Sequence, residues 1–256
     1  MTVLVTGAGG RIGRHVTRRL LDAGRTVRAL VIPDDPARAW LAAQPGVELA
    51  EGRLEDPASL RAAVDGVTAV IHLAAALTSR GGIDDEFFAS NAAGTYHLLA
   101  ALRDTRTTLT RFVYISSIAA CGLGRHLKGR READPCFKSG VPYNDAKLDT
   151  EALVRRYQTA KGMDATVIRP ANVIGPGSVW VRDVLDSYRR LTVPLIDGGR
   201  WSASLVYVEN LVDGIVRAST QEAGRGKTYQ FRDDWNVTWK QYLTDLGAMI
   251  GKAPGF

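Results

Sequence analysis

A set of glycines directly after a strand-like run constrains this chain most. The run Thr2–Thr6 is not interrupted by charged residues, which is typical of a parallel strand buried on both faces. Gly7, Gly10 and Gly13 follow it, and apolar residues then recur at helical spacing up to Gly24. Glycines at such a turn let the backbone approach a pyrophosphate, and the helix N-terminus offers N–H groups to it. The spacing GxxGxxG predicts a dinucleotide-binding turn, although an ordinary strand–helix turn carries glycines too.

The rest of the chain alternates short apolar runs with amphipathic stretches. Strands are predicted at residues 2–6, 26–32, 47–51, 67–73, 111–116, 165–168 and 228–231. Helices are predicted at residues 12–23, 37–43, 57–64, 84–102, 142–161 and 210–218. This alternation predicts an α/β fold with a doubly wound parallel sheet, the Rossmann fold, because neighbouring parallel strands need a helical crossover. We expect a core over residues 1–170 and a small, interleaved substrate lobe over 171–256, reduced or truncated in size.

Composition and charge exclude several classes of protein. With 256 residues, 45% of them hydrophobic, the chain can bury one sizeable core. Its net charge of +6 comes from scattered arginines rather than a basic stripe, so no nucleic-acid partner is expected. No apolar run reaches the roughly 20 residues of a membrane helix. Because structure begins at Thr2, no secretory signal is expected, and the cytoplasm is the predicted location.

The chain has two cysteines, Cys121 and Cys136. They are too few for a disulfide framework and lack metal-type spacing with histidine. Both are predicted to be free thiols, and no metal site is expected.

A tyrosine and a lysine four residues apart carry the second chemical signal. Tyr143 and Lys147 fall on one face of the predicted helix 142–161, so the ammonium is expected near the phenol and to favour its ionised form. Such a phenol exchanges protons with a carbonyl or alcohol oxygen. Ser116 and Ser117, at the end of the fifth predicted strand, add hydroxyl groups beside this pair. Chance surface pairs have the same spacing, so the combination with the glycine turn decides the interpretation.

Together these motifs resemble the extended short-chain dehydrogenase/reductase family, which includes NAD-dependent epimerases and dehydratases. The resemblance spans residues 2–231. Its ordered motifs are TGAGGRIG from Thr6, VIHLAA from Val70, NAAGT from Asn91, YISS from Tyr114, YNDAK from Tyr143, RPANVIGPG from Arg169 and VYVENLVDGI from Val206.

The resemblance implies roles for individual residues. Ser117 would bind the substrate oxygen, Tyr143 would be the catalytic acid or base, and Lys147 would hold the nicotinamide ribose and tune Tyr143. Asn91 matches the family's helix asparagine beside the cofactor. Ser116 is expected to support Ser117, and His72 to be a packed strand residue. The implied cofactor contacts are Gly7, Gly10, Arg11, Ile12, Gly13, Leu54, Leu73, Ala74, Ala75, Tyr143, Lys147, Pro170 and Val173.

The cofactor's phosphate preference rests on the end of the second strand. An acidic residue there usually selects NAD, and an arginine usually selects NADP. Here the expected place of the acid, near Val31, is apolar, and Ile32 stands at the usual arginine position. Arg11 and Arg38 can approach a 2′-phosphate from either side. NAD(P) is therefore the expected cofactor, leaning to NADP.

The expected reaction interconverts a secondary alcohol and a ketone or aldehyde by hydride transfer. Ser117 is followed by Ile118-Ala119-Ala120, where dehydratases of the family carry an Asp-Glu pair, so dehydration is disfavoured. Cys121 replaces a tyrosine common in sugar-nucleotide enzymes, and the lobe is small for a nucleotide-bearing substrate. A small, apolar substrate fits better. Four residues are equally expected to line an apolar pocket or to form the core of the lobe: Val179, Trp180, Trp201 and Leu205.

Two other functions stay open. Sugar-nucleotide epimerisation uses the same hydride step, and a non-catalytic NAD(P)-sensing regulator would share the glycine turn. Such sensors commonly lack an intact Ser-Tyr-Lys set, which this chain retains in Ser117, Tyr143 and Lys147. By analogy with the family, a homodimer is expected, formed through the helices that begin near Asp84 and Pro142.

Overall fold

The structure is a computed structural model and describes residues 1–76, 88–105, 107, 109–122, 129–190 and 193–255. The chain forms two compact units. The first contains Met1–Arg169 and Val212–Gln230, and the second contains Pro170–Leu211 and Phe231–Phe256. Within the described ranges, no helix is both long and apolar enough to cross a membrane.

A seven-stranded sheet organises the first unit, in the order β3-β2-β1-β4-β5-β6-β9. Every pairing from β3 across to β6 is parallel. The strands are β1 (Thr2–Thr6), β2 (Thr26–Val31), β3 (Val47–Glu51), β4 (Ala69–His72), β5 (Arg111–Ile115), β6 (Ala165–Pro170) and β9 (Thr228–Phe231). The order reverses between β1 and β4, where a doubly wound sheet opens a crevice for ligands. The predicted Rossmann fold is confirmed.

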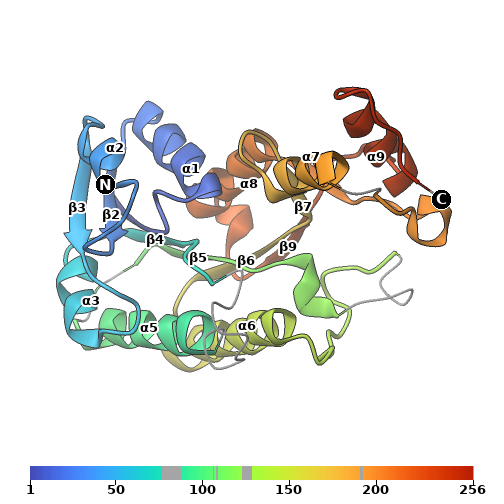
Figure 1. The fold of residues 1–256 in the computed structure, drawn as a ribbon. Helices are drawn as coiled ribbons and strands as arrows, with labels where there is room; N and C mark the ends of the chain where they lie inside the picture. Colours follow the sequence, from blue (N-terminus) through green and yellow to red (C-terminus); the bar gives the residue numbers. More distant parts are fainter. Residues whose placement is uncertain (77–87, 106, 108, 123–128, 191–192, 256) are drawn as a thin grey trace. The chain divides into compact units, whose positions relative to one another are not determined.

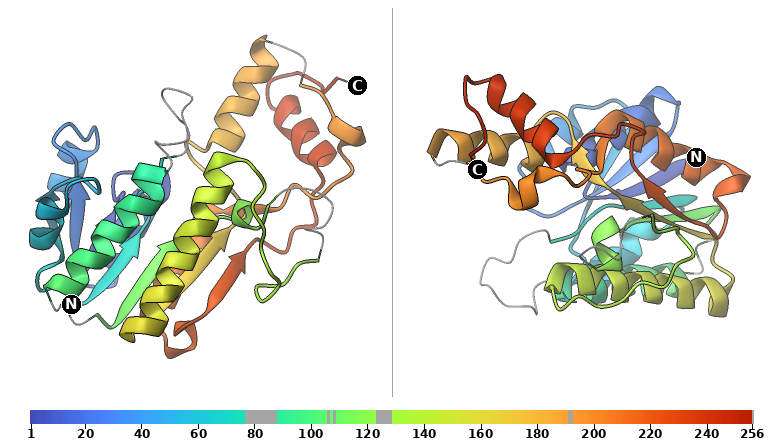
Figure 2. Two further views of the ribbon diagram at one scale, coloured as in Figure 1. Left: turned by 90° about the horizontal axis from the view of Figure 1, so that it is seen from below. Right: turned by 90° about the vertical axis from the view of Figure 1, so that its right-hand side faces the viewer.

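Helices cover both faces of this sheet (Figure 1). On one face lie α3 (Pro57–Val64), α5 (Gly94–Asp104) and α6 (Pro142–Lys161), and Figure 2 shows α5 and α6 running side by side. On the other lie α1 (Arg11–Asp22) and α8 (Val208–Thr220), which are linked by an ion pair between Arg19 and Asp213. A short helix, α2 (Arg38–Ala42), connects β2 to β3.

Single residues fix the ends of helices α3 and α6, and α6 carries Tyr143 and Lys147. The Asp56 carboxylate accepts a hydrogen bond from the Ala58 N–H at 3.0 Å, and Pro57 occupies the first helical position of α3. Pro142 does the same at the start of α6. Gly162 ends α6 in the left-handed conformation, with a φ of 63°. The boundaries predicted for α3 and α6 are therefore confirmed.

The predicted helix 84–102 differs from the structure. Residues 84–87 lie outside the described residues. Phe88–Ala93 form a π-helical segment, η1, and only then does α5 begin, at Gly94. The π-helical turn carries Asn91, and such single turns are frequent at functional sites.

The core of the first unit lies between the sheet and the helices α3, α5 and α6. All residues of β4, β5 and β6 are buried, as is β1 beyond Thr2. Burial on both faces explains why these strands are rich in apolar residues. The buried residues of this core include Leu4, Val70, Phe112, Val167, Leu60, Leu98, Leu99 and Val154.

The second unit has its own small core. Its strands β7 (Asn172–Ile174) and β8 (Leu205–Tyr207) pair in parallel, and α7 (Val179–Arg190) and α9 (Trp239–Ala248) pack beside them. Tyr188 donates its hydroxyl to the Leu243 carbonyl at 2.9 Å, and Asp233 accepts the Tyr207 N–H at 2.8 Å. None of these four elements was predicted; β7 and β8 are only three residues long each.

The four residues that we expected either to line an apolar pocket or to form the core of the lobe lie in different environments. Leu205 is buried in the core of the second unit. Trp180 is partly exposed and lies against Trp239, with ring centroids 5.6 Å apart. Trp201 is also partly exposed and donates its indole N–H to Asp197 at 2.7 Å. Val179 begins α7. The core interpretation is right for Leu205.

His72 is a buried strand residue, as predicted, and belongs to a chain of hydrogen bonds. Its Nδ1 lies 2.6 Å from the Thr6 hydroxyl, and its Nε2 lies 2.8 Å from the Thr95 hydroxyl. Thr95 donates its only hydroxyl proton to the Asn91 carbonyl at 2.6 Å. His72 therefore donates from Nε2, and because burial lowers its pKa to about 3, the ring is neutral at pH 7 and accepts from Thr6 at Nδ1.

This neutral ring predicts a pH-dependent loss of stability. Burial, with a smaller effect of the Lys147 charge, lowers the pKa of His72 to about 3. In the unfolded chain the ring titrates near 6.5, so the unfolded state binds more protons between these values and stability falls as pH drops below 6.5. We expect His72 to cost about 2 kcal/mol at pH 5 relative to pH 7.5. Urea unfolding at both pH values measures this loss.

His72→Gln provides the control, because an amide can donate to Thr95 and accept from Thr6 without titrating. Its unfolding free energy should depend less on pH over the same range. Equal pH dependence in His72→Gln and the wild type would contradict the assignment.

Candidate active site

The glycine turn after β1 is built so that backbone packs on backbone. Gly7 has a φ of 69°, and its carbonyl accepts a hydrogen bond from the Gly10 N–H at 3.0 Å. A Cβ on Gly13 would lie 2.0 Å from the Gly7 carbonyl oxygen. Gly10 precedes α1 and gives it no side-chain cap. The first N–H groups of α1 thus suit an anionic group, and Arg11 and Ile12 begin this helix.

The turn after β4 lies against the glycine turn. A Cβ on Gly7 would be 2.9 Å from the Ala74 nitrogen. The Thr6 hydroxyl accepts the Ala74 N–H at 3.1 Å, and the Thr6 carbonyl accepts the Leu73 N–H at 3.2 Å. The structure therefore brings Leu73 and Ala74, followed by Ala75, to the predicted pyrophosphate turn, at the point where the strand order reverses.

Asn91 extends this arrangement to the helical layer. Its side chain is buried, accepts the Ala76 N–H at 2.9 Å and donates to the Ala76 carbonyl at 3.2 Å. Its own carbonyl accepts the hydroxyls of Thr95 and Thr150 at 2.6 and 3.2 Å. Thr150 belongs to α6. Asn91 thus connects the chain that leaves β4 to the helix that bears Tyr143 and Lys147.

Ser117, Tyr143 and Lys147 come together from the end of β5 and the start of α6. Ser117 caps a short 3-10 helix, η2 (Ile118–Cys121), by accepting the Ala119 N–H at 3.1 Å. Tyr143 hydrogen-bonds Ser117. The Lys147 ammonium donates to the Ile115 carbonyl at 2.9 Å and lies 5.9 Å from the centre of the Tyr143 ring. This is the arrangement that the two sequence motifs predict.

The electrostatics of the set differ in one respect from the sequence-based expectation. Burial raises the pKa of Tyr143, and the hydrogen bond with Ser117 opposes that rise. Burial also lowers the pKa of Lys147 to about 8, against the attraction of Glu151. The expected stabilisation of the phenolate by Lys147 is therefore not the dominant effect. At neutral pH Tyr143 is a phenol that can donate a proton, and Lys147 is mostly an ammonium.

The remaining predicted cofactor contacts lie elsewhere in the fold. Leu54 is buried at the turn after β3, and its carbonyl accepts the His97 Nδ1–H at 2.8 Å. Pro170 ends β6, and Val173 lies in β7 opposite Val206. Pro170 and Val173 belong to the second unit, and their predicted contact with a carboxamide stays a prediction.

A buried ion pair that the sequence motifs did not predict lies beside the candidate catalytic residues. Glu151 lies one helical turn after Lys147 on α6, and Arg169 lies in β6; both are about 2% exposed or less. Arg169 donates from Nε and Nη2 to the two carboxylate oxygens at 2.9 and 2.7 Å. Ser116 donates to the same carboxylate at 2.6 Å, which confirms its expected supporting position as a satisfied strand-end hydroxyl. An acidic residue on the buried face of the Tyr–Lys helix was the available signal.

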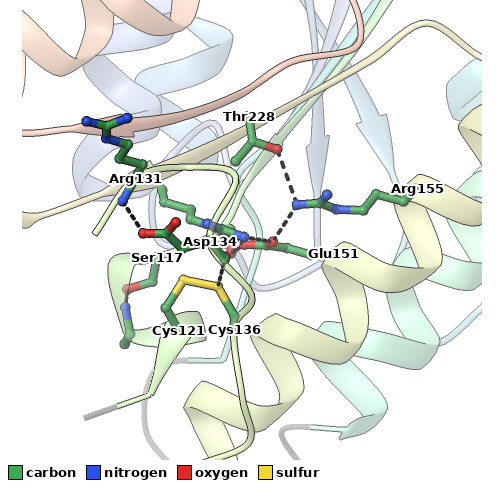
Figure 3. The surroundings of a disulfide bond; sticks show 11 residues. Ser117, Cys121, Arg131, Asp134, Cys136, Glu151, Arg155 and Thr228 are labelled. Carbon is green, nitrogen blue, oxygen red and sulfur yellow. Dashed lines mark hydrogen bonds and ion pairs between the residues drawn. A yellow bond between two sulfur atoms is a disulfide. The ribbon is translucent and has the colours of Figure 1, made fainter. Parts of the chain in front are cut away.

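The prediction that both cysteines are free thiols is wrong in the structure. Cys121 and Cys136 form a disulfide, with Cα atoms 4.2 Å apart (Figure 3). The fold brings together η2 and the segment before α6, which sequence spacing alone could not show. The disulfide thus links the residues that follow Ser117 to those that precede Tyr143.

Comparison with known proteins identifies the family. The model of the family described as "NAD dependent epimerase/dehydratase family" matches residues 3–235. The chain belongs to this family. Its match to the whole core confirms the resemblance based on the glycine, YISS and YNDAK motifs.

Two relatives of the epimerase/dehydratase family are dehydrogenases or reductases by name. The chain is 33% identical to the Stigmatella aurantiaca 4-hydroxy-2-methyl-3-oxo-4-farnesyl-3,4-dihydroquinoline-1-oxide ketoreductase, over 96% of this chain and 72% of that protein. It is 34% identical to a Mycobacterium tuberculosis 3 beta-hydroxysteroid dehydrogenase/Delta 5-->4-isomerase, over 85% of this chain and 60% of that protein. The chain thus spans between three fifths and three quarters of their length.

Solved structures of the family share the fold. The UDP-glucose 4-epimerase of Thermus thermophilus, in complex with NAD, superposes with a TM-score of 0.82 at 24% identity, covering 99% of this chain and 85% of that one. The Streptomyces venezuelae dTDP-glucose 4,6-dehydratase DesIV, with NAD bound, gives a TM-score of 0.81 at 25% identity, covering 98% and 82%.

The tight glycine packing predicts unequal effects of two neighbouring substitutions. Gly13→Ala places a methyl group against the Gly7 carbonyl oxygen, so α1 must move; we expect a loss of about 3 kcal/mol or more in unfolding free energy. Gly10→Ala leaves its new Cβ 3.1 Å from the same oxygen, at an ordinary φ of −69°. Its cost should stay under about 1 kcal/mol. Urea unfolding of both variants checks this order, and equal costs would refute the packing argument.

Proposed function

We propose that this member of the epimerase/dehydratase family is an NAD(P)-dependent oxidoreductase that interconverts a secondary alcohol and a ketone or aldehyde. The observation that carries the proposal is the meeting of Ser117, which follows β5, with Tyr143 and Lys147 of α6, beside the sheet whose first strand leads into the glycine turn. The names of the two dehydrogenase and reductase relatives support the same reaction.

The residues present suit a dinucleotide. Gly7 and Gly13 leave no room for side chains, and α1 begins without a side-chain cap, so a pyrophosphate can approach its N–H groups. When bound, the nicotinamide supplies or accepts the hydride. Tyr143 donates its phenolic proton to the forming alkoxide oxygen, and in the reverse direction takes it from the alcohol. Ser117 hydrogen-bonds that oxygen, and the Lys147 ammonium offsets negative charge as it develops.

The segment after Ser117 favours this reaction over dehydration. Elimination of water needs a further acid and base, but η2 continues with Ile118, Ala119 and Ala120. None of these side chains can transfer a proton. Sugar-nucleotide epimerisation remains the enzymatic alternative, and a non-catalytic cofactor sensor remains the alternative of another class.

An apolar, ring-containing ketone or alcohol is the proposed substrate class. The two relatives described above are named for such compounds, a farnesylated quinoline oxide and a hydroxysteroid.

The expected homodimer and the cytoplasmic location stay predictions, and gel filtration tests the homodimer.

The proposed cofactor preference leans to NADP. Ile32, directly after β2, is 40% exposed, and the Asp35 carboxylate accepts the Ala37 N–H at 2.8 Å. Arg11 begins α1, and Arg38 begins α2, where it pairs with Glu51 at 2.9 Å. These two arginines are the proposed partners of a 2′-phosphate.

Side-by-side fluorescence titrations test the cofactor proposal. NADPH should bind at least several-fold more tightly than NADH, because a 2′-phosphate gains charge-assisted hydrogen bonds from arginine. Arg11→Ala and Arg38→Ala should each weaken NADPH binding while leaving NADH binding nearly unchanged. Tighter binding of NADH would reverse the preference, and binding of neither would refute the dinucleotide proposal.

The catalytic assignment predicts a selective loss in Tyr143→Phe. Removing the phenolic proton should lower kcat by about 100-fold or more, since general acid–base groups contribute factors of this size. Cofactor affinity should change little because the ring remains. A panel of cyclic ketones and alcohols, followed by cofactor absorbance, measures turnover. Full activity in Tyr143→Phe would show that another group transfers the proton.

A further inference from the structure

Glu151 is a buried carboxylate whose two oxygens both have donors. It lies on α6, one turn after Lys147 and two turns after Tyr143, and is 1% exposed. Oε1 accepts from Ser116 at 2.6 Å and from Arg169 Nε at 2.9 Å, while Oε2 accepts from Arg169 Nη2 at 2.7 Å. Three elements therefore meet at one carboxylate: the end of β5, the middle of α6 and the end of β6.

Among the groups that the described elements place around Lys147, Glu151 supplies the negative charge. From β5, the neutral Tyr114 ring lies 5.1 Å from the ammonium, and burial raises the pKa of its hydroxyl well above 10. From β4, His72 is neutral, with a pKa of about 3. On α6 itself, Tyr143 is a phenol at neutral pH.

Arginines surround the far side of the carboxylate. Arg169 forms the two-point pair, and Arg155, half exposed, lies 3.5 Å from Oε2 in an ion pair that Figure 3 shows. The attraction of Glu151 raises the pKa of Lys147, because a nearby negative charge favours the protonated form. Burial of Lys147 opposes this attraction and is the larger effect.

We propose that Glu151 is a positioning residue of the active site: its charge keeps the buried Lys147 protonated, and its hydrogen bonds fix Ser116 and hence the chain at Ser117. The inference rests on the proposed function, because it assigns importance to the state of Lys147. The orienting contacts are short and buried, so they limit the movement of β5 relative to α6. Arg169 pairs with the carboxylate through two hydrogen bonds, so the buried Glu151 charge has a direct partner.

The charge of Glu151 predicts a measurable change in Lys147. Glu151→Gln removes the attraction but leaves burial, so the pKa of Lys147 should fall from about 8 by about one pH unit. NMR titration of the chain labelled with 13C at lysine Cε reads this value without cofactor or substrate. Lys147→Arg identifies the signal by its disappearance. Exposed lysines titrate near 10.4 and do not overlap with it.

Two further variants separate charge from structure. Ser116→Ala removes one hydrogen bond but keeps the carboxylate, so the pKa of Lys147 should stay close to the wild-type value. Glu151→Leu combined with Arg169→Met removes both charges and fills the space with apolar atoms, an exchange that buried ion pairs commonly tolerate. This double variant should show the lowered pKa even if Glu151→Gln does not fold. An unchanged Lys147 titration in the charge-removing variants, or an equal shift in Ser116→Ala, overturns the proposal.

Activity measurements then distinguish this inference from the proposed function. If both hold, the alkaline limb of kcat/KM should move to lower pH in Glu151→Gln, by the same amount as the NMR titration. A shifted NMR titration in a chain without hydride-transfer activity would overturn the catalytic role of Lys147 and leave the electrostatic role of Glu151 intact. Turnover with an unshifted titration would do the opposite.

Discussion

The buried pair of Glu151 and Arg169 is the interaction on which the geometry of the active site depends. Removing two charges from water is costly, and an apolar pair of the same volume often gives equal or greater stability. An apolar pair, however, cannot fix the orientation of its side chains through hydrogen bonds. Here two hydrogen bonds from Arg169 and a third from Ser116 fix one carboxylate at the junction of β5, α6 and β6. Because Ser117 follows Ser116, and because Tyr143 and Lys147 lie on the same helix as Glu151, this contact links the two segments that carry the proposed catalytic residues.

His72 and Lys147 are two buried basic side chains near that junction, and they differ in charge at neutral pH. His72 gives up its proton and is satisfied by two threonine hydroxyls, one of which donates to the Asn91 carbonyl. Lys147 keeps its proton at neutral pH, helped by Glu151 and by the Ile115 carbonyl. A second charge at His72 would repel Lys147, so the neutral histidine helps to keep the ammonium. A charged ammonium therefore lies 5.9 Å from the centre of the Tyr143 ring.

Local sequence signals made most of the fold predictable, whereas contacts between segments distant in the sequence could not be predicted. The helix ends at Pro57 and Pro142 follow from single residues, and the glycine turn follows from a strand that reads as buried on both faces. The Ser-Tyr-Lys set was identified because Tyr143 and Lys147 share a helix face. The π-helical turn at Asn91, the Cys121–Cys136 disulfide and the partners of Glu151 depend on contacts between segments distant in sequence. No periodicity encodes such contacts.

The disulfide and the ion pair constrain the proposed catalytic residues from two sides. Ser117 lies between Ser116, which is tied to α6 through Glu151, and Cys121, which is tied through Cys136 to the chain that leads into α6. A displacement of α6 along the sheet would have to stretch one link or the other. In the proposed reaction, Ser117 and Tyr143 both hydrogen-bond one substrate oxygen, and small displacements in such sites cost large factors in rate. Links on both sides of Ser117 limit such displacement, as the proposed proton transfer from Tyr143 to a substrate oxygen held by Ser117 would require.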